Sequence, residues 1–262
     1  MGAGVAVSDV VWTDVVSDTG SAPTRDFLSR HDGGEVPGAL WLPADARPKA
    51  LILVGHGGSR HKREVTTLKF IAEAVERNGF AAAAIDGPLH GARRGDRSPE
   101  PSDTQNDFLD LWKSPGNGVA KMLADWQASL TMLLSEPKLV GIPVGYFGLS
   151  MGTAFGLPLL AADTRIGAAV VGMWGANYPN SNILVEAAGQ VDCPILFMHK
   201  TEDHFFTLEG ALKIYDAIPG DDKRLLMTPG PHGEATPEQI ETALTFFTRC
   251  LVIMRNHSSK IS

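Results

Sequence analysis

The segment Val144-Gly145-Tyr146-Phe147-Gly148-Leu149-Ser150-Met151-Gly152 decides the fold that we expect. A short apolar run leads into a Gly-x-Ser-x-Gly pattern, and apolar and small residues typical of a helix follow. A serine on so sharp a turn between strand and helix needs a glycine two positions before and after it, because larger side chains would collide with the backbone. The segment therefore predicts a nucleophile elbow that exposes the Ser150 hydroxyl. It also places the amide of Met151 at a helix N-terminus, where it can stabilise negative charge.

The pattern alone does not decide the function, because a chain with 28 glycines contains such strings by chance. The rest of the chain supplies more evidence, since short apolar runs alternate with amphipathic stretches. Runs of this kind predict strands buried on both faces, here at residues 50–54, 81–85, 144–149, 168–171, 195–198 and 225–227. Helical spacing of apolar residues lies between them, from about 68 to 77, 119 to 133, 208 to 218 and 236 to 247. This alternation predicts a mostly parallel central sheet with helices on both faces.

The two ends of the chain carry their own signals. The N-terminal stretches 10–16 and 25–42 predict an antiparallel ribbon at the sheet edge, with a turn at Gly33-Gly34. The last helix has a full start signal, with Thr236 as N-cap, Pro237 in the first turn and Gln239 three residues after the cap. The polar residues 256–262 predict a frayed tail. We expect residues 1–262 to form one α/β domain.

The stretch from 87 to 118 is polar, contains several prolines and shows no clear periodicity. Long segments of this kind in a compact domain usually have a function or are mobile. Its Phe108–Trp112 cluster is expected to be too short for a packed helix, yet too apolar to be left in water. We therefore expect residues 87–118 to form a small cap over the active site. The alternative is a surface excursion whose aromatic residues only pack on the domain.

Composition and charge exclude several classes of protein. The net charge of −7 argues against nucleic acid as a partner, because phosphate binding needs a basic face. No apolar run approaches the roughly 18 residues that span a bilayer, and the N-terminus shows no secretory signal, so we expect no membrane association. The two cysteines, Cys193 and Cys250, provide neither a disulfide framework nor a metal cluster. These features favour a cytoplasmic protein, with the oligomeric state open and a homodimer considered.

Three residues with complementary chemistry follow three expected strands. Ser150, Asp203 and His232 occur in that order, and ligands of parallel sheets bind beyond the carboxyl ends of the strands. A histidine, with an ordinary pKa near 6.5, can remove the proton of a serine hydroxyl near neutral pH, and a carboxylate can orient the imidazole. Glu202 is the rival for the acid. Asp203 is followed by the aromatic pair Phe205 and Phe206, which could form a wall of the site, and the family resemblance given below also favours Asp203.

The chain resembles serine esterases of the α/β-hydrolase superfamily, in the dienelactone-hydrolase-like branch. The resemblance is carried by five stretches that together span roughly residues 50 to 255: GHGGS at 55–59, DGPLHG at 86–91, GLSMG at 148–152, HKTEDHFF at 199–206 and GPHG at 230–233. It implies the α/β-hydrolase fold, a Ser150–His232–Asp203 triad and no cofactor. One residue departs from the pattern, since dienelactone hydrolases proper use a cysteine nucleophile where this chain has Ser150.

The resemblance also implies an oxyanion hole. Gly57 and Gly58 follow the strand at 50–54, and the amide of Gly58 is the expected partner of the Met151 amide, with Gly57 close to the substrate. A phosphate-binding loop is not expected, because no Gly-Lys-Ser/Thr follows these glycines. Trp112 and Trp174 have two alternative interpretations: they line the acyl pocket, or they pack in the core as aromatic residues usually do.

Two histidines and three arginines near this loop have alternative interpretations. His56 and His90 lack the spacing of metal ligands, so we expect no metal at these residues. We expect both histidines to form hydrogen bonds to the loop backbone instead. His90 is also a candidate substrate-binding residue. Arg93, Arg94 and Arg97 could attract an acidic substrate, although a solvated loop is the expectation.

These observations predict a serine hydrolase that cleaves small-molecule carboxylic esters through an acyl-enzyme. The same residues could act on amides, thioesters, lactones or C–C bonds, because the pocket selects the leaving group. A non-catalytic ligand receptor on this fold is disfavoured, since the nucleophile, base, acid and oxyanion glycines all occur.

Overall fold

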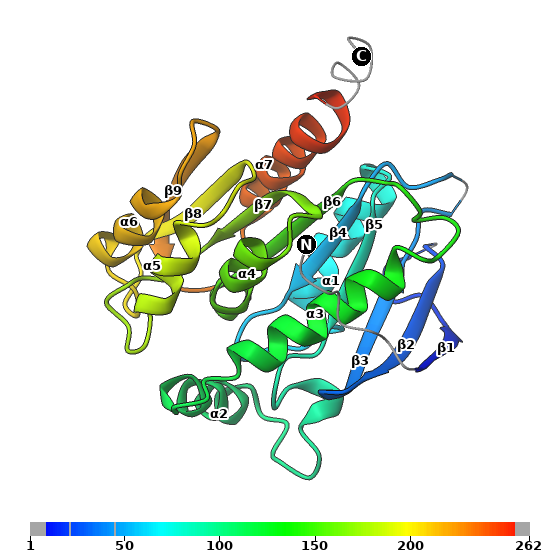
Figure 1. Cartoon of the computed structure of the whole chain (residues 1–262), viewed down its shortest axis with the longest axis horizontal. Helices are drawn as coiled ribbons and strands as arrows, with labels where there is room; N and C mark the ends of the chain where they lie inside the picture. The colour runs from blue at the N-terminus through cyan, green and yellow to red at the C-terminus, as the bar shows by residue number, and fades with distance from the viewer. Residues whose placement is uncertain (1–8, 21, 45, 255–262) are drawn as a thin grey trace. The chain divides into compact units, whose positions relative to one another are not determined.

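The computed structural model describes residues 9–20, 22–44 and 46–254 (Figure 1). The chain forms two compact units, Met1–Ile142 and Pro143–Ser262. The single domain expected over 1–262 stays a prediction. The expected frayed tail at 256–262, and the first eight residues, on which the signal-peptide argument depends, lie outside the described residues.

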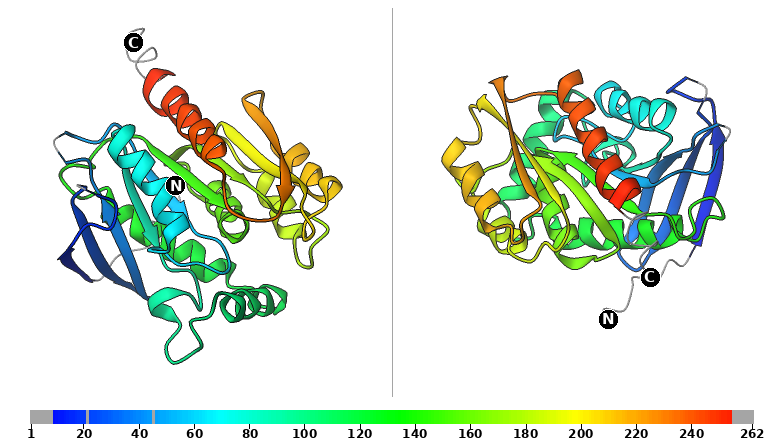
Figure 2. Two further views of the ribbon diagram at one scale, coloured as in Figure 1. Left: turned by 180° about the vertical axis from the view of Figure 1, so that it is seen from behind. Right: turned by 90° about the horizontal axis from the view of Figure 1, so that it is seen from above.

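Five strands form the sheet of the first unit, in the order β1-β2-β3-β5-β4. The pairs β1–β2, β2–β3 and β3–β5 are antiparallel, and β4–β5 is parallel. The predicted ribbon and its turn are confirmed, and the ribbon is the blue part of Figure 2. The bounds of the strands are β1 Asp9–Val15, β2 Thr24–His31, β3 Gly34–Trp41, β4 Leu51–Gly55 and β5 Ala81–Ile85.

The described helical segments of the first unit include one that the sequence analysis did not foresee. They are α1 (Val65–Ala72), the π-helical turn η1 (Glu73–Arg77), the 3₁₀ turn η2 (Gly91–Arg93), α2 (Pro101–Lys113) and α3 (Val119–Leu133). The expectation that the Phe108–Trp112 cluster is too short for a packed helix was wrong. Thr104, Phe108 and Trp112 are buried at four-residue spacing along α2, and Pro101 opens it.

The second unit is a parallel α/β layer structure. Its strands pair in the order β6-β7-β8-β9, every pair parallel. Figures 1 and 2 show α4 and α7 on opposite faces of these strands, which confirms the expectation of a mostly parallel sheet covered on both faces. The strands are β6 Val144–Leu149, β7 Ile166–Gly172, β8 Ile195–Glu202 and β9 Lys223–Pro231.

The helices of the second unit follow the strands in alternation. They are α4 (Met151–Ala162), α5 (Asn182–Ala188), α6 (Leu208–Ala217) and α7 (Pro237–Phe247), which continues as the π-helical turn η3 (Thr248–Ile253). The short α5 was not predicted. Three strands are longer than predicted, since β7 spans Ile166–Gly172, β8 extends to Glu202 and β9 extends to Pro231. In the described part of the chain, no helix has the length and apolarity to cross a membrane.

The predicted start of α7 is confirmed as a capping box. The Thr236 hydroxyl accepts a hydrogen bond from the Gln239 amide at 3.2 Å, and the Gln239 side chain accepts one from the Thr236 amide at 3.0 Å. The substitution Thr236→Ala should therefore lower the free energy of unfolding by about 1 kcal/mol, because an amide at the helix start loses its acceptor. Urea denaturation measures this change.

Thr242→Ala is the matched control for this prediction. The Thr242 hydroxyl donates to the Glu238 carbonyl within the same helix and caps no helix end. Its removal should change the free energy of unfolding by less than about 0.5 kcal/mol. Equal losses for the two variants would mean that the capping box does not stabilise α7.

Candidate active site

Ser150 occupies a strained turn between β6 and α4. Its backbone has φ 57° and ψ −119°, a positive φ that is uncommon for a residue with a side chain. A Cβ added at Gly148 would lie 2.9 Å from the carbonyl oxygen of Gly152. The turn therefore excludes a side chain at Gly148, as the steric argument predicted. The Met151 amide begins α4.

The second unit brings the three predicted catalytic side chains together. Asp203 follows β8 and His232 follows β9, so both come from the carboxyl ends of parallel strands, as Ser150 does. The distance from His232 Nδ1 to Asp203 Oδ2 is 2.7 Å, and that from His232 Nε2 to Ser150 Oγ is 3.1 Å. With the Nδ1 proton directed at the carboxylate, Nε2 is free to accept the proton of the serine hydroxyl.

Asp203 is held as an anion by its hydrogen bonds. Its side chain is fully buried, and Oδ1 accepts bonds from the amides of Phe205 and Phe206 at 2.9 and 3.0 Å. Burial alone would raise the pKa of this carboxyl, but the bonds from His232 and the two amides outweigh burial and hold its pKa below the ordinary value. The rival, Glu202, is exposed at the end of β8. The geometry therefore pairs His232 with Asp203.

Aromatic side chains surround the imidazole of His232. The rings of Phe205 and Phe206 lie 5.3 and 5.4 Å from it, both in edge-to-face geometry. Trp174 stacks on Phe206 at 4.5 Å and is fully buried, with its indole N–H donating to the hydroxyl of Ser181. Trp174 thus supports the wall beside His232, while its contact with substrate stays a prediction.

Two polar side chains that the sequence analysis did not select hold the loops of Asp203 and His232. The Asn177 side chain accepts a bond from the Thr207 amide and donates one to the Phe205 carbonyl, both at 3.1 Å. Lys200 is buried, and its ammonium group donates to the Glu234 carbonyl at 2.7 Å. Asn177 follows β7, and Lys200 lies near the carboxyl end of β8. Their position near the carboxyl ends of parallel strands is the sequence signal that could have identified them.

In the first unit, two histidines fix the loop of Gly57 and Gly58. His56 Nε2 accepts the Gly87 amide at 2.9 Å, so Nδ1 carries the proton and donates to the Gly57 carbonyl at 2.9 Å. His90 Nε2 lies 2.8 Å from the Gly58 carbonyl. The expectation that these histidines bond loop backbone is confirmed. Burial lowers the pKa of His56 to about 3 and also depresses that of His90.

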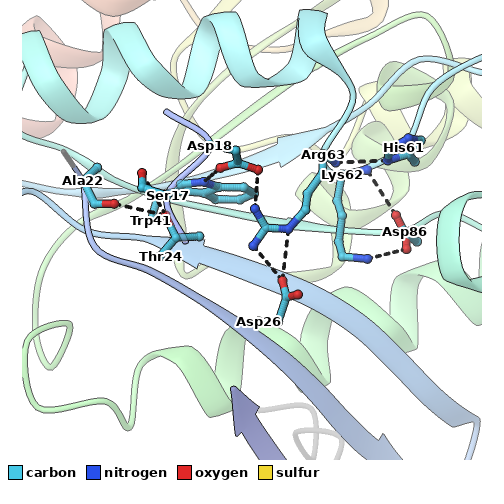
Figure 3. Close-up of polar contacts among 10 residues, drawn as sticks. All are labelled: Ser17, Asp18, Ala22, Thr24, Asp26, Trp41, His61, Lys62, Arg63 and Asp86. Atoms are coloured by element: carbon cyan, nitrogen blue, oxygen red, sulfur yellow. Dashed lines mark hydrogen bonds and ion pairs between the residues drawn. The ribbon is translucent and has the colours of Figure 1, made fainter. Parts of the chain in front are cut away.

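A buried ion pair holds the segment that follows this loop (Figure 3). Lys62 Nζ lies 2.6 Å from Asp86 Oδ2, and the Lys62 amide donates to Asp86 Oδ1. Arg63 binds Asp26 at 2.8 Å and also Asp18, and it lies over the ring of Trp41. The segment after Gly58 is thereby anchored to the antiparallel ribbon. These pairs were not predicted from the sequence, because their partners lie far apart in the chain.

The expectation of a solvated arginine loop was wrong for two of the three arginines. Arg93 binds the fully buried Asp125 at 2.6 Å, and Arg94, itself buried, binds Asp107 at 3.1 Å. Arg97 is more exposed and also binds Asp107, at 3.3 Å. All three charges are thus paired with carboxylates within the first unit, and Arg93 and Arg94 hold the segment between β5 and α2.

Helix α2 packs on the glycine loop of its own unit. A Cβ added at Gly58 would lie 2.8 Å from Phe108 Cδ1, so this position has room only for glycine. Trp112, one turn further along α2, is fully buried. The structure therefore gives Trp112 a core position, and the predicted cap over the active site and the contact of Trp112 with substrate stay predictions. Over the described residues, there is no group of three or more metal-binding side chains.

Comparisons with known proteins agree with this architecture. Residues 36–225 match the dienelactone hydrolase family. The chain is 33% identical to a cold-adapted esterase from an Arctic intertidal metagenomic library, over 92% of this chain and 99% of the esterase, with a TM-score of 0.79. Acetyl xylan esterase 1 from Thermoanaerobacterium sp. JW/SL YS485 has the same fold, at 13% identity over 92% and 88% of the two chains and a TM-score of 0.70.

Curated relatives are longer than this chain. The putative phosphoribosyl transferase MT0597 of Mycobacterium tuberculosis (strain CDC 1551 / Oshkosh) is 25% identical over 209 residues, which cover 79% of this chain and 42% of the relative. The chain thus matches less than half the length of that relative.

The chain belongs to the dienelactone hydrolase family and has the α/β-hydrolase fold. It carries a hydrolase domain of the carboxylesterase type, as its sequence predicted.

The buried His56 generates a prediction for stability as a function of pH. Between about pH 6.5 and its folded pKa of about 3, His56 is neutral in the folded state and protonated in the unfolded state. The unfolded state then binds one more proton, so the free energy of unfolding should fall on acidification by up to about 1.4 kcal/mol per pH unit from this residue. Urea titrations from pH 6.5 to 4 should show a smaller slope for His56→Gln than for the wild type.

The control is His61→Gln, which removes an exposed histidine from the same loop and should change the slope much less than His56→Gln does. The slope is informative even though His56→Gln also lowers stability at neutral pH. An unchanged slope in His56→Gln would contradict the neutral, buried state of this imidazole.

Proposed function

We propose that this protein is a serine hydrolase that cleaves small-molecule carboxylic esters through an acyl-serine intermediate. The observation that carries the proposal is the continuous hydrogen-bond chain from Asp203 through His232 to Ser150. It is supported by the 33% identity with a solved esterase over nearly the whole length of both chains. The proposed steps need only side chains, backbone amides and water.

In the first half of the reaction, Ser150 Oγ attacks the ester carbonyl while His232 Nε2 takes its proton. The carbonyl oxygen becomes an oxyanion, and the imidazolium is stabilised by the Asp203 carboxylate. His232 then gives the proton to the leaving alcohol as the C–O bond breaks, which leaves an acyl-serine. In the second half, water attacks the acyl group with the same imidazole as base. The free acid leaves and the hydroxyl of Ser150 is restored.

The oxyanion needs donors that are fixed in advance. We assign this role to the amides of Met151 and Gly58, and each such donor is worth about 3 kcal/mol in the transition state. Met151 lies at the N-terminus of α4, where the helix dipole favours negative charge. Gly57 permits a close approach of substrate, since the nearest heavy atom to an added Cβ is 3.8 Å away. His90, Trp112 and Trp174 complete the proposed set of substrate-binding residues.

A reduced compartment, the cytoplasm, is part of the proposal. Cys193 and Cys250 are free thiols, and burial raises the pKa of these thiols to about 12 and about 11. Thiols of this kind are poor nucleophiles, so neither competes with Ser150.

The substitution Ser150→Ala should lower kcat/KM for p-nitrophenyl acetate by about a thousandfold or more, because it removes the hydroxyl that lies 3.1 Å from His232 Nε2. Circular dichroism checks that the fold is intact. A fluorophosphonate should label the wild type at Ser150 and leave the variant unlabelled. Near-native activity of the variant would remove Ser150 from the mechanism, and a wild type that neither labels nor turns over esters would favour a receptor.

The two adjacent carboxylates provide a second test. Asp203→Asn should lower kcat by about a thousandfold or more, because an amide can hold His232 in the wrong tautomer. Glu202→Gln is a control of the same chemistry one residue away, on an exposed side chain, and should change kcat by roughly twofold at most. The assignment of the acid is wrong if Glu202→Gln is the damaging change. Both rates are measured with the same ester and normalised to folded protein.

A further inference from the structure

We propose that Thr153 is a positioning residue for the nucleophile, because its hydroxyl ties the strained turn at Ser150 to the ends of two parallel strands. This inference rests on the proposed function of Ser150. It concerns a side chain that touches neither His232 nor Asp203 in the hydrogen-bond chain described above.

The Thr153 hydroxyl lies at a junction of three backbone groups. Thr153 is the third residue of α4 and is fully buried. Its Oγ1 lies 2.6 Å from the carbonyl oxygen of Gly172, at the end of β7, and 2.9 Å from that of Gly148, near the end of β6. The amide of Gly172 donates to the same Oγ1 at 2.7 Å. One hydroxyl proton serves the two carbonyls, and an oxygen lone pair accepts the amide.

The same groups hold Ser150 on both sides of its turn. The Ser150 amide donates to the Gly172 carbonyl at 3.0 Å, the oxygen that the Thr153 hydroxyl also contacts. The Thr153 amide donates to the Ser150 carbonyl at 2.8 Å. Thr153 thus binds Ser150 directly through the backbone and indirectly through Gly172. A non-glycine residue at φ 57° keeps that conformation only where the surrounding structure stabilises it. At Ser150, these hydrogen bonds provide that stabilisation.

Gly172 is packed closely against β8, so we expect its backbone to stay in place when the Thr153 hydroxyl is removed. Its φ is 144°, and an added Cβ would lie 1.9 Å from the carbonyl oxygen of Met198 on β8. The next amide, of Met173, donates to that same oxygen at 2.8 Å. The backbone of β7 therefore packs closely against β8 at this point. Loss of the Thr153 hydroxyl leaves the buried Gly172 amide without this acceptor. We expect the turn at Ser150 to shift in response.

A small displacement of this turn matters more for the chemical step than for binding. Proton transfer needs the 3.1 Å contact between Ser150 Oγ and His232 Nε2, and a misplacement of about 1 Å can cost about a hundredfold in rate. Removal of the Thr153 hydroxyl should therefore act on kcat. KM should change little, because the fully buried side chain presents no surface to a substrate.

The experiment compares Thr153→Val, which keeps the shape of the side chain and removes the hydroxyl, with Thr153→Ser, which keeps the hydroxyl. Thr24→Val is the control, because Thr24 is also buried and its hydroxyl also donates to a backbone carbonyl, that of Ala22 in the first unit. Steady-state rates with p-nitrophenyl acetate and rates of fluorophosphonate labelling are normalised to folded protein and measured at low temperature.

Thr153→Val should lower kcat and the labelling rate by about 10- to 100-fold with KM within roughly twofold of the wild type. Thr153→Ser should recover kcat to within about threefold, and Thr24→Val should match the wild type. The proposal is overturned if Thr153→Val keeps its kcat, if Thr153→Ser is impaired as severely as Thr153→Val, or if Thr24→Val loses as much activity.

Two further outcomes are also decisive. If Thr153→Val does not fold, Thr153→Ala takes its place, and failure of both to fold would make Thr153 a residue of the fold alone and overturn the proposal. Failure of the proposed function looks different, because the wild type would then neither hydrolyse the ester nor react with the fluorophosphonate. In that case amide hydrogen exchange still decides whether Thr153 holds the turn. The exchange of the Gly172 and Ser150 amides should be faster in Thr153→Val, and unchanged exchange would overturn the proposal.

Discussion

The strained backbone at Ser150 is the constraint on which the rest of the site depends. A positive φ at a serine is unfavourable, so the turn persists only because its amide bonds to β7, its carbonyl bonds to α4, and Gly148 leaves room for the chain to reverse. Once the turn is fixed, the hydroxyl lies within hydrogen-bond distance of His232. The parallel strands β8 and β9 complete the arrangement, since Asp203 and His232 follow their carboxyl ends at the same edge.

The loop of Gly57 and Gly58 in the first unit is fixed by a different device. Neutral His56 bridges Gly57 and Gly87, and the Lys62–Asp86 ion pair joins the same two loops a few residues further on. In the proposed reaction, an oxyanion donor on this loop must be rigid before substrate arrives, because reorganisation during the reaction would cancel its benefit. Buried side chains that bond the backbone on both sides of this loop supply that rigidity.

Much of this arrangement was predictable from the sequence, because buried strands are continuous apolar runs and the candidate functional residues follow them directly. Ser150, Asp203 and His232, which the structure brings together, were selected in this way, and the start of α7 was predicted from its capping residues. Helix α2 was missed because few buried residues mark its inner face within a polar, acidic stretch, and one of them, Thr104, is itself polar. The pairing of Arg93 with Asp125 was missed because the partners are 32 residues apart, and no local pattern encodes such a contact.

Trapping of the intermediate shows whether Ser150 becomes acylated, as we propose. The wild type is mixed with p-nitrophenyl acetate, quenched in acid within the first turnovers and digested, and the peptides are read by mass spectrometry. We expect one acetyl group on the peptide that contains Ser150, and none on that peptide after the intermediate has turned over. Two results would contradict the proposal. One is ester hydrolysis with the acetyl group on another residue, and the other is ester hydrolysis with no acylated peptide in either the wild type or Asp203→Asn.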